Sequence, residues 1–400
     1  MPKLLWLLEY PTVNGGERSL AAAAPWVRAA GFDLAAVVPE ASDVAALLRS
    51  LGVRVVELVA DAMTDGARQS QAERRARLVE LFTAEAPDLV VANSLSMARL
   101  TGPVTREMAI AAGGHLRDIV GLSPAAVADI NCLDRLWAVS QAACDFHVGQ
   151  GVSADKLRVA YNGIDLEHFR PRPRTGSLAA ELGLPRETRF LGTIGQLVQR
   201  KGVDVVLDGF LQIAGELPDW HLVMVGERYS QKDEARVFER ALHERAGKSP
   251  SGERVHFLGR RDDVDMLLPE FDLLVHAARQ EPLGRVLLEA AACGVPIVAT
   301  DVGGTPEIFS ITDRANNTLE PGAACELVPP GDVAAFAAAL RRLAGDPEQR
   351  ERMRVAARGC VQAKFDIRLR GPAIAAEYHD LLRPNAAVEN SSAMCYNNKR

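Results

Sequence analysis

The sequence predicts an α/β protein made of two doubly wound, Rossmann-like domains, and three observations support this prediction. The chain has 400 residues, more than one hydrophobic core usually serves. Short apolar runs alternate with helical segments along its length, which is typical of parallel sheets covered by helices. Residues 170–178 are rich in proline and arginine, the composition of a linker. We therefore expect one domain over residues 1–174 and a second over residues 175–365.

The composition is that of an ordinary globular protein, with 48% hydrophobic and 24% charged residues. A net charge of -6 argues against general binding of nucleic acid, which needs a basic surface. The six cysteines show no CxxC or Cys/His metal spacing, and several stand in apolar contexts. A reducing cytoplasm is therefore the simplest location for the protein.

Membrane contact is expected to be peripheral at most, at the inner face, because no segment approaches the roughly 18 apolar residues of a membrane helix. The N-terminal run Leu4–Leu8 is short and polar residues follow it, which favours a buried strand over a signal peptide. Arginines 74, 75 and 77 lie on one expected helix. We interpret them as a solvated face, with contact to an anionic membrane as the alternative.

In the first half of the chain, strands are expected over residues 4–9, 33–39, 54–58, 88–92, 136–140 and 156–160, with another ending near residue 114. The loop Asn14–Glu17 contains two glycines between the first strand and a helix. Two glycines let the backbone approach an anion closely, but the same pattern is a common tight turn, so both interpretations stay open. His115 follows two glycines at a strand end, where ligand-facing side chains gather in doubly wound folds.

In the second half, strands are expected over residues 190–194, 221–225, 255–258, 271–276, 297–300 and 325–328. A helix is expected over Asp204–Ile213, and the last helix over residues 366–384. The polar, Asn-rich residues 385–400 are expected to form a disordered tail.

The stretch from Phe271 to Thr300 indicates a strand, a loop, a helix rich in Leu and Ala, and a second strand. Backbone N–H groups at the start of that helix favour an anionic group such as phosphate. Two carboxylates bracket this point, Glu281 on the loop and Glu289 on the helix. Glu281 is compatible with an ordinary loop charge, and Glu289 with an exposed helix position. However, the apolar neighbours of Glu289 favour burial, where polyol hydroxyls would serve as partners.

Several segments resemble the signature of retaining GT-B glycosyltransferases of the glycogen-synthase-like "glycosyl transferases group 1" superfamily, family-four type. They are Glu281 and Glu289 with seven residues between them, the strand segment Cys293–Ala299, and Asp301-Val-Gly-Gly-Thr-Pro-Glu307. The turn Asn162–Asp165 is similar to the family segment that closes the first domain. The resemblance implies a GT-B fold, in which two Rossmann-like domains face a central cleft and the last helix crosses back onto the first domain.

The resemblance also implies roles for individual residues. His115, Lys201 and Glu281 would be catalytic: His115 near the reacting sugar carbon, Lys201 on the diphosphate and Glu281 on the sugar hydroxyls. The donor would be bound by Gly15, Gly16, Gln196, Arg200, Gly226, Arg260, Arg261, Leu283, Gly284, Arg285 and Glu289. Asn14, Glu17 and Asp118 would lie on the acceptor side. For Arg260 and Arg261, solvated loop arginines are the alternative.

Gln196 departs from the family pattern, which has an arginine at this position. A charge-assisted hydrogen bond contributes about 1.5–3 kcal/mol, against about 1 kcal/mol for a neutral one, so we expect a weaker grip on the donor. Arg200 is a candidate to compensate, although a side chain next to Lys201 is expected to point elsewhere. Asp263 and Asp265 are interpreted as charges at a helix start, so no metal and no other cofactor is expected.

These features predict an enzyme that moves a hexose-type sugar from a UDP- or GDP-sugar to a hydroxyl acceptor with retention. The acceptor stays open among a small glycoside, a lipid, a polysaccharide and a protein. Two alternatives keep the fold: a nucleotide-sugar epimerase or hydrolase, which would turn over the donor without an acceptor, and a binding-only relative, which would leave every donor unconsumed.

Overall fold

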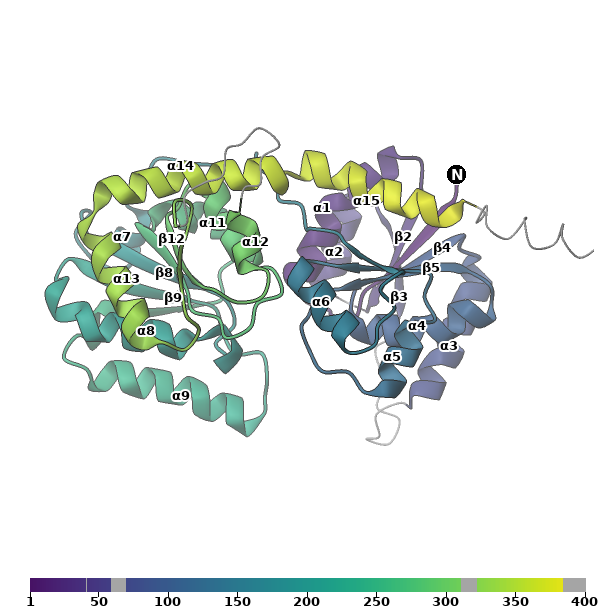
Figure 1. Ribbon diagram of the computed structural model, residues 1–400, viewed down its shortest axis with the longest axis horizontal. Coiled ribbons are helices and arrows are strands. Elements are labelled where there is room, and N and C mark those ends of the chain that lie inside the picture. Colours follow the sequence, from purple (N-terminus) through teal and green to yellow (C-terminus); the bar gives the residue numbers. More distant parts are fainter. Residues whose placement is uncertain (41, 59–69, 311–321, 384–400) are drawn as a thin grey trace, which may run out of the picture.

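The computed structural model describes residues 1–40, 42–58, 70–310 and 322–383, and these form two α/β domains side by side (Figure 1). Within the described residues, the first domain has a sheet in the order β3-β2-β1-β4-β5-β6-β7 and the second in the order β10-β9-β8-β11-β12-β13. All strand pairs within both sheets are parallel. The predicted pair of doubly wound domains is therefore confirmed. The expected tail, residues 385–400, lies outside the described residues.

The first domain contains β1 Lys3–Leu7, α1 Gly15–Ala29, β2 Asp33–Pro39, α2 Asp43–Ser50, β3 Arg54–Leu58, α3 Gln71–Glu85, β4 Leu89–Ala92, α4 Leu95–Glu107, β5 Ala111–Leu116, α5 Pro124–Ile130, β6 Arg135–Ala138, α6 Gln141–Gly149 and β7 Leu157–Val159. Helices cover both faces of this sheet (Figure 1). Consecutive residues of β1 accordingly enter different cores: Leu5 and Leu7 pack on one face, and Leu4 and Trp6 on the other. Burial on both faces explains why this strand is a continuous apolar run.

The second domain contains α7 Ser177–Glu181, β8 Arg189–Ile194, the 3₁₀ turn Gln199–Lys201, α8 Val203–Ile213, β9 Trp220–Val225, α9 Asp233–Lys248, β10 Val255–Gly259, α10 Val264–Leu267, β11 Leu273–His276, α11 Arg285–Cys293, β12 Ile297–Thr300, α12 Thr305–Phe309, β13 Glu326–Val328, α13 Val333–Gly345 and α14 Pro347–Lys364. The strand order reverses between β8 and β11 here, and between β1 and β4 in the first domain. In doubly wound sheets, ligands bind at the carboxyl ends of strands at such switch points.

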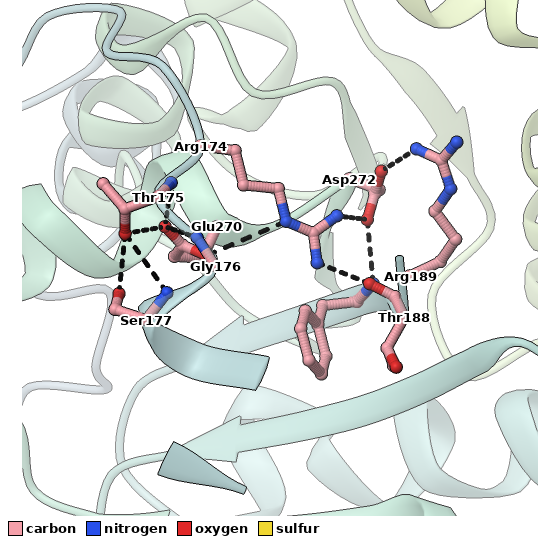
Figure 2. Close-up of polar contacts among 9 residues, drawn as sticks. Arg174, Thr175, Gly176, Ser177, Thr188, Arg189, Glu270 and Asp272 are labelled. Atoms are coloured by element: carbon pink, nitrogen blue, oxygen red, sulfur yellow. Dashed lines mark hydrogen bonds and ion pairs between the residues drawn. The ribbon is translucent and has the colours of Figure 1, made fainter. Parts of the chain in front are cut away.

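The linker joins the second domain through a cluster of polar contacts at Arg174–Gly176 (Figure 2). The carboxylate of Glu270, 1% exposed, accepts hydrogen bonds from the backbone N–H groups of Thr175 and Gly176 at 2.8 and 3.1 Å. Arg174 is paired with Asp272 at 3.1 Å. These contacts fix the chain to the second domain directly after the proline-rich segment.

The last helix, α15 Ile367–Leu382, crosses from the second domain onto the first and packs against α1, as predicted (Figure 1). Tyr378 is completely buried there. Where α15 begins, Ile164 of the first domain receives a hydrogen bond from Ile367 at 2.9 Å and donates one to Phe365 at 2.7 Å. The chain thus passes between the domains at two adjacent points. No helix in the described part of the chain is both long and apolar enough to cross a bilayer.

Candidate active site

Two loops at the switch point of the second sheet are packed directly on each other. Gly202, just after the turn that carries Lys201, has a φ of 62°, and a Cβ there would lie 1.7 Å from the carbonyl oxygen of Ala277. Only glycine fits such a position. Arg279 adds a hydrogen bond to the carbonyl of Arg200 at 2.9 Å and a two-pronged ion pair with Asp204 at 2.8 Å. The position of Lys201 relative to the loop after β11 is therefore set by the backbone.

Glu281 is the buried centre of this site, with 5% of its surface exposed. Its Oε2 accepts hydrogen bonds from Lys201 Nζ at 2.5 Å and from His276 Nε2 at 2.9 Å. Burial alone would raise the pKa of this carboxyl, but the charge of Lys201 and the hydrogen bond from His276 outweigh it and lower the pKa below its ordinary value. Glu281 is thus an anion at neutral pH. Burial lowers the pKa of His276, so its ring is neutral.

The carbonyl of Glu281 connects this loop to the segment after β12. It accepts a hydrogen bond from the N–H of Gly304 at 3.1 Å. Gly303 has a φ of 53°, and a Cβ there would lie 2.0 Å from the same carbonyl oxygen. Further along, the carboxylate of Glu307 accepts hydrogen bonds from the N–H groups of Gln141 and Ala142, both at 2.8 Å, at the start of α6 in the first domain. The segment Gly303–Glu307 therefore touches the Glu281 loop on one side and the first domain on the other.

Helix α11 presents its N-terminus to the same region, directly after Gly284. Its first backbone N–H groups have no acceptor within the helix, so they favour an anion. On this helix Glu289 is 7% exposed, and Arg285 Nε donates to it at 2.7 Å. Arg285 also donates to Ser19 Oγ of α1 at 3.0 Å, across the boundary between the domains. The expected burial of Glu289 is confirmed, and its partner in this structure is Arg285.

Across from α11, Gly15 and Gly16, which were expected in a loop, instead begin α1 and pack against two arginines. A Cβ on Gly15 would lie 3.6 Å from Arg285 Cδ, and one on Gly16 3.0 Å from Arg117 Cδ. Arg117 donates to Asn93 Oδ1 at 2.9 Å and to Asn162 Oδ1 at 2.7 Å. Burial lowers the pKa of Arg117 to about 10. Loops after β1, β4, β5 and β7 therefore converge on this guanidinium.

Two protein families match consecutive parts of this chain. Residues 13–168 match Glycosyltransferase Family 4, and residues 177–359 match Glycosyl transferases group 1. The two ranges cover both domains and contain Gly15 and Gly16 in the first and Lys201, Glu281 and Glu289 in the second. The chain carries a Family 4 glycosyltransferase domain followed by a group 1 glycosyltransferase domain.

Curated relatives match this chain over part of their length. It is 32% identical over 152 residues to the lipopolysaccharide core biosynthesis mannosyltransferase LpsB of Rhizobium meliloti, a match that covers 38% of this chain and 42% of that protein. It is 31% identical over 227 residues to the N-acetyl-alpha-D-glucosaminyl L-malate synthase of Bacillus anthracis, covering 57% of this chain and 54% of that protein. The chain thus spans about half the length of the curated relatives it matches.

Solved structures match it over nearly the whole chain. Alr3699/HepE of Anabaena, in complex with UDP and glucose, has a TM-score of 0.79 at 23% identity, covering 94% of this chain and 99% of that one. Sucrose-phosphate synthase of Thermosynechococcus elongatus has a TM-score of 0.75 at 21% identity, covering 95% and 99%. At this level of identity the likeness concerns the fold, and it confirms the GT-B architecture of the chain.

His115 lies within β5 and deeper in the first domain than Arg117, which directly follows that strand. It is 4% exposed, its Nε2 lies 3.0 Å from the hydroxyl of Tyr378, and its ring lies 5.1 Å from that of Trp137. Burial keeps the pKa of this histidine well below its ordinary value. With Arg117, it lines a small cavity between α1, the segment after β7 and α15. Arg117 was not predicted, although the alternation of a strand places residues 115 and 117 on one face, with the later one nearer the carboxyl edge.

The three residues expected on the acceptor side have local structural contacts. Asn14 precedes α1, and its N–H donates to Glu17 Oε2 at 3.2 Å, so this pair caps the helix. Burial raises the pKa of Glu17. Asp118 has an exposed side chain, and its carbonyl accepts a hydrogen bond from His147 Nε2 at 2.8 Å.

The expected donor-binding residues Gln196, Gly226, Arg260 and Arg261 follow the carboxyl ends of β8, β9 and β10. A Cβ on Gly226 would lie 1.9 Å from the carbonyl oxygen of Gly195, so the loop that carries Gln196 packs tightly there. Arg260 lies 3.3 Å from Asp262 and 3.9 Å from Asp43 of the first domain. Arg261 is instead engaged by Asp263 and by Glu181 of α7, both at 2.7 Å.

We expected Arg200 as a candidate to compensate for Gln196, and we expected no metal ion in the site. Arg200 lies close enough to His276 for its charge to contribute to the lowered pKa of that ring, so a second cation stands near Glu281 besides Lys201. Among the described residues, no group of three His, Cys, Asp or Glu side chains is arranged to hold a metal ion. Asp263 is committed to its pair with Arg261.

Proposed function

We propose that this protein is a retaining, metal-independent glycosyltransferase that moves a hexose-type sugar from a UDP- or GDP-sugar to a hydroxyl acceptor. The observation that carries the proposal is the convergence of Lys201, Glu281 and the N-terminus of α11 at one switch point. The solved complexes of the similar HepE with UDP and with UDP-glucose support a uridine nucleotide. The mannosyltransferase name of LpsB supports a hexose.

In this proposal the second domain binds the donor. Lys201 and the free N–H groups of α11 stabilise the charge that builds on the departing diphosphate. Glu281 and the backbone at Leu283 and Gly284 hold sugar hydroxyls, and Glu289 holds the ribose hydroxyls. Because Glu281 is an anion, it accepts hydrogen bonds and does not act as an acid.

The transfer itself needs one bond to break and one to form on the same face of the sugar. The bond between the anomeric carbon and the diphosphate oxygen breaks, and the acceptor oxygen bonds to that carbon. The acceptor proton goes to the departing diphosphate, so no protein base is required. Closure of the two domains would exclude water from this step.

The acceptor would enter from the first domain, near Gly15, Gly16, Arg117 and Asp118. A small glycoside, a lipid, a polysaccharide and a protein all present a suitable hydroxyl. We place the reaction in the cytoplasm, with at most peripheral contact to the inner face of the membrane.

The proposal is tested by thermal shifts with UDP, GDP, ADP and their common sugar conjugates, on the natural protein and on Glu289→Gln. A ligand at about a hundred times its Kd stabilises by about 2.7 kcal/mol, which is readily measured. We expect one nucleotide to stand out and Glu289→Gln to lose the shift. No shift with any nucleotide at millimolar concentration would contradict the proposal.

Gln196 favours a second candidate, a nucleotide-sugar-binding protein that hydrolyses or epimerises the donor or leaves it unconsumed. Without the family arginine, the diphosphate has one cation fewer to stabilise its departure. Donor turnover without any acceptor would support hydrolysis or epimerisation. Donor binding with no turnover across an acceptor panel would support the binding-only protein.

A further inference from the structure

His276 lies beside Glu281 although neither the sequence pattern nor the family resemblance assigned it a role. It is the last residue of β11, and the loop that follows turns back so that His276 Nε2 lies 2.9 Å from Glu281 Oε2. Only 2% of its surface is exposed. The turn is held by Thr300, which donates to the carbonyl of Ala278 at 2.5 Å, and by the hydrogen bond from Gly304 to the carbonyl of Glu281.

The two oxygens of the Glu281 carboxylate differ in their contacts. Oε2 accepts from both Lys201 and His276. Oε1 accepts no hydrogen bond from any residue that the structure describes. Since a carboxylate is planar, two donors on Oε2 also fix the direction in which Oε1 points. One oxygen is thus anchored, and the other is left for a ligand hydroxyl.

The two donors on Oε2 differ in mobility. The side chain of Lys201 is 18% exposed, and that of His276 is 3% exposed. Lys201 has three N–H donors on a flexible stem, so it can turn toward an incoming diphosphate. His276 is enclosed and has a neutral ring that donates from one nitrogen only. His276 is therefore the donor with less freedom to leave Glu281.

We propose that His276 is a positioning residue that keeps Glu281 in place as an anion while Lys201 engages the donor diphosphate, leaving Glu281 Oε1 for a hydroxyl of the donor sugar. This rests on the proposed function, because it assigns the sugar to Glu281 and the diphosphate to Lys201. A buried carboxylate that loses its donors takes up a proton instead, and a protonated Glu281 would present a different hydrogen-bond pattern to the sugar.

The first test compares the Kd of UDP with that of UDP-glucose, or of GDP with GDP-mannose if the guanosine nucleotide stands out. The variants are His276→Phe, which removes the donor, His276→Gln, which keeps one, and Glu281→Gln. His256→Phe is the matched control, since His256 is a partly buried strand histidine whose partner is His221. We expect His276→Phe to weaken the sugar nucleotide by tenfold or more, to leave the free nucleotide within about twofold, and His276→Gln to recover part of the loss.

A structural role would give a different result: both ligands would weaken equally, or neither would change. The pH profile separates the two roles further. Removing His276 raises the pKa of Glu281 toward its ordinary value of 4.5, so the binding of UDP-glucose to His276→Phe should weaken as the pH falls from about 6 to about 4. The natural protein should show no such loss over this range. A flat profile in His276→Phe would overturn the proposal.

A second measurement works without any ligand and so separates this inference from the proposed function. Nitrogen-15 NMR of histidine-labelled protein at pH 7 should show His276 neutral and protonated on Nε2, assigned by its loss in His276→Gln. A ring protonated on Nδ1 alone, or on both nitrogens, would overturn the assignment. If the natural protein binds no nucleotide while this tautomer is found, the proposed function fails and the contact between His276 and Glu281 stands.

Discussion

The contact between Lys201 and Glu281 shows how one residue pair serves both the fold and the proposed chemistry. Glu281 has its charge stabilised inside the protein, and Lys201 is held at the switch point before any ligand arrives. Removing two charges from water costs free energy, and their mutual attraction offsets this desolvation cost while both partners are present. It becomes visible when one partner is removed.

We predict that Lys201→Met lowers the free energy of unfolding by about 3 kcal/mol, since removing one partner of a buried ion pair leaves an uncompensated charge. Adding Glu281→Gln to Lys201→Met should restore most of the loss. Urea unfolding at pH 7 measures both variants. Lys248→Met is the control, because its ion pair with Glu244 is exposed and should contribute nothing measurable. Equal losses in the single and double variants would contradict the prediction.

We predict that replacing Gln196 by arginine strengthens nucleotide binding. Gln196→Arg should tighten the binding of the preferred nucleoside diphosphate about fivefold, because a charge-assisted hydrogen bond exceeds a neutral one by about 1 kcal/mol. Isothermal titration gives the Kd of each variant. Gln199→Arg adds the same charge at an exposed position of the next turn and should leave the Kd unchanged. A gain of the same size in both variants would show that only the overall charge matters.

At the scale of elements, the sequence predicted most strands and the order of the helices, because buried parallel strands are apolar runs and the turns carry glycine and proline. The contacts between elements were harder to predict from the sequence. Arg117 and His276 stand in segments that were assigned correctly, yet their partners come from residues that only the folded chain brings close. Lys201, Glu281 and Glu289 were predicted because their spacing resembles a family, and the structure does bring Lys201 and Glu281 together.

The close packing of Gly202 on the loop after β11 leads to a prediction about stability. Gly202→Ala should destabilise the protein by about 2 kcal/mol or more beyond the cost of its backbone conformation, since the added Cβ would collide with the carbonyl of Ala277. Gly183→Ala is matched to it: Gly183 has a similar φ, 67°, but open space around it, so only the conformational cost of about 1–2 kcal/mol applies. Thermal and urea unfolding compare the two. Similar losses would show that the loop after β11 can shift to accommodate Gly202→Ala.

At the scale of the whole molecule, the domains are tied by polar contacts as well as by the chain. Glu307 of α12 accepts hydrogen bonds from two N–H groups at the start of α6 and from the hydroxyl of Tyr161 at 2.8 Å. A second contact between the domains comes from α11, where Arg285 donates a hydrogen bond to Ser19 of α1. The tie through Glu307 is continuous with the Glu281 loop, so the orientation of the domains and the geometry of the proposed sugar site are coupled.

We predict that Glu307→Ala broadens the range of domain orientations, because three hydrogen bonds across the boundary are lost. Small-angle X-ray scattering should show a larger radius of gyration than that of the natural protein. Glu326→Ala is the control, since Glu326 pairs with Arg342 within the second domain. An unchanged scattering curve for Glu307→Ala would mean that the two chain crossings and the remaining contacts, such as that of Arg285 with Ser19, are enough to hold the domains.

The path of α15 has a consequence for how such proteins diversify. This helix completes the core of the first domain, yet it follows the whole second domain in the sequence and lies outside both matched family regions, which end at residues 168 and 359. A recombination event that exchanged only the coding region of residues 1–174 would bring a foreign sheet under a resident helix, with Tyr378 facing an unfamiliar surface. If the first domain binds the acceptor, as proposed, an exchange of acceptor specificity therefore requires a discontinuous module, in which residues 1–174 and the last helix are inherited together.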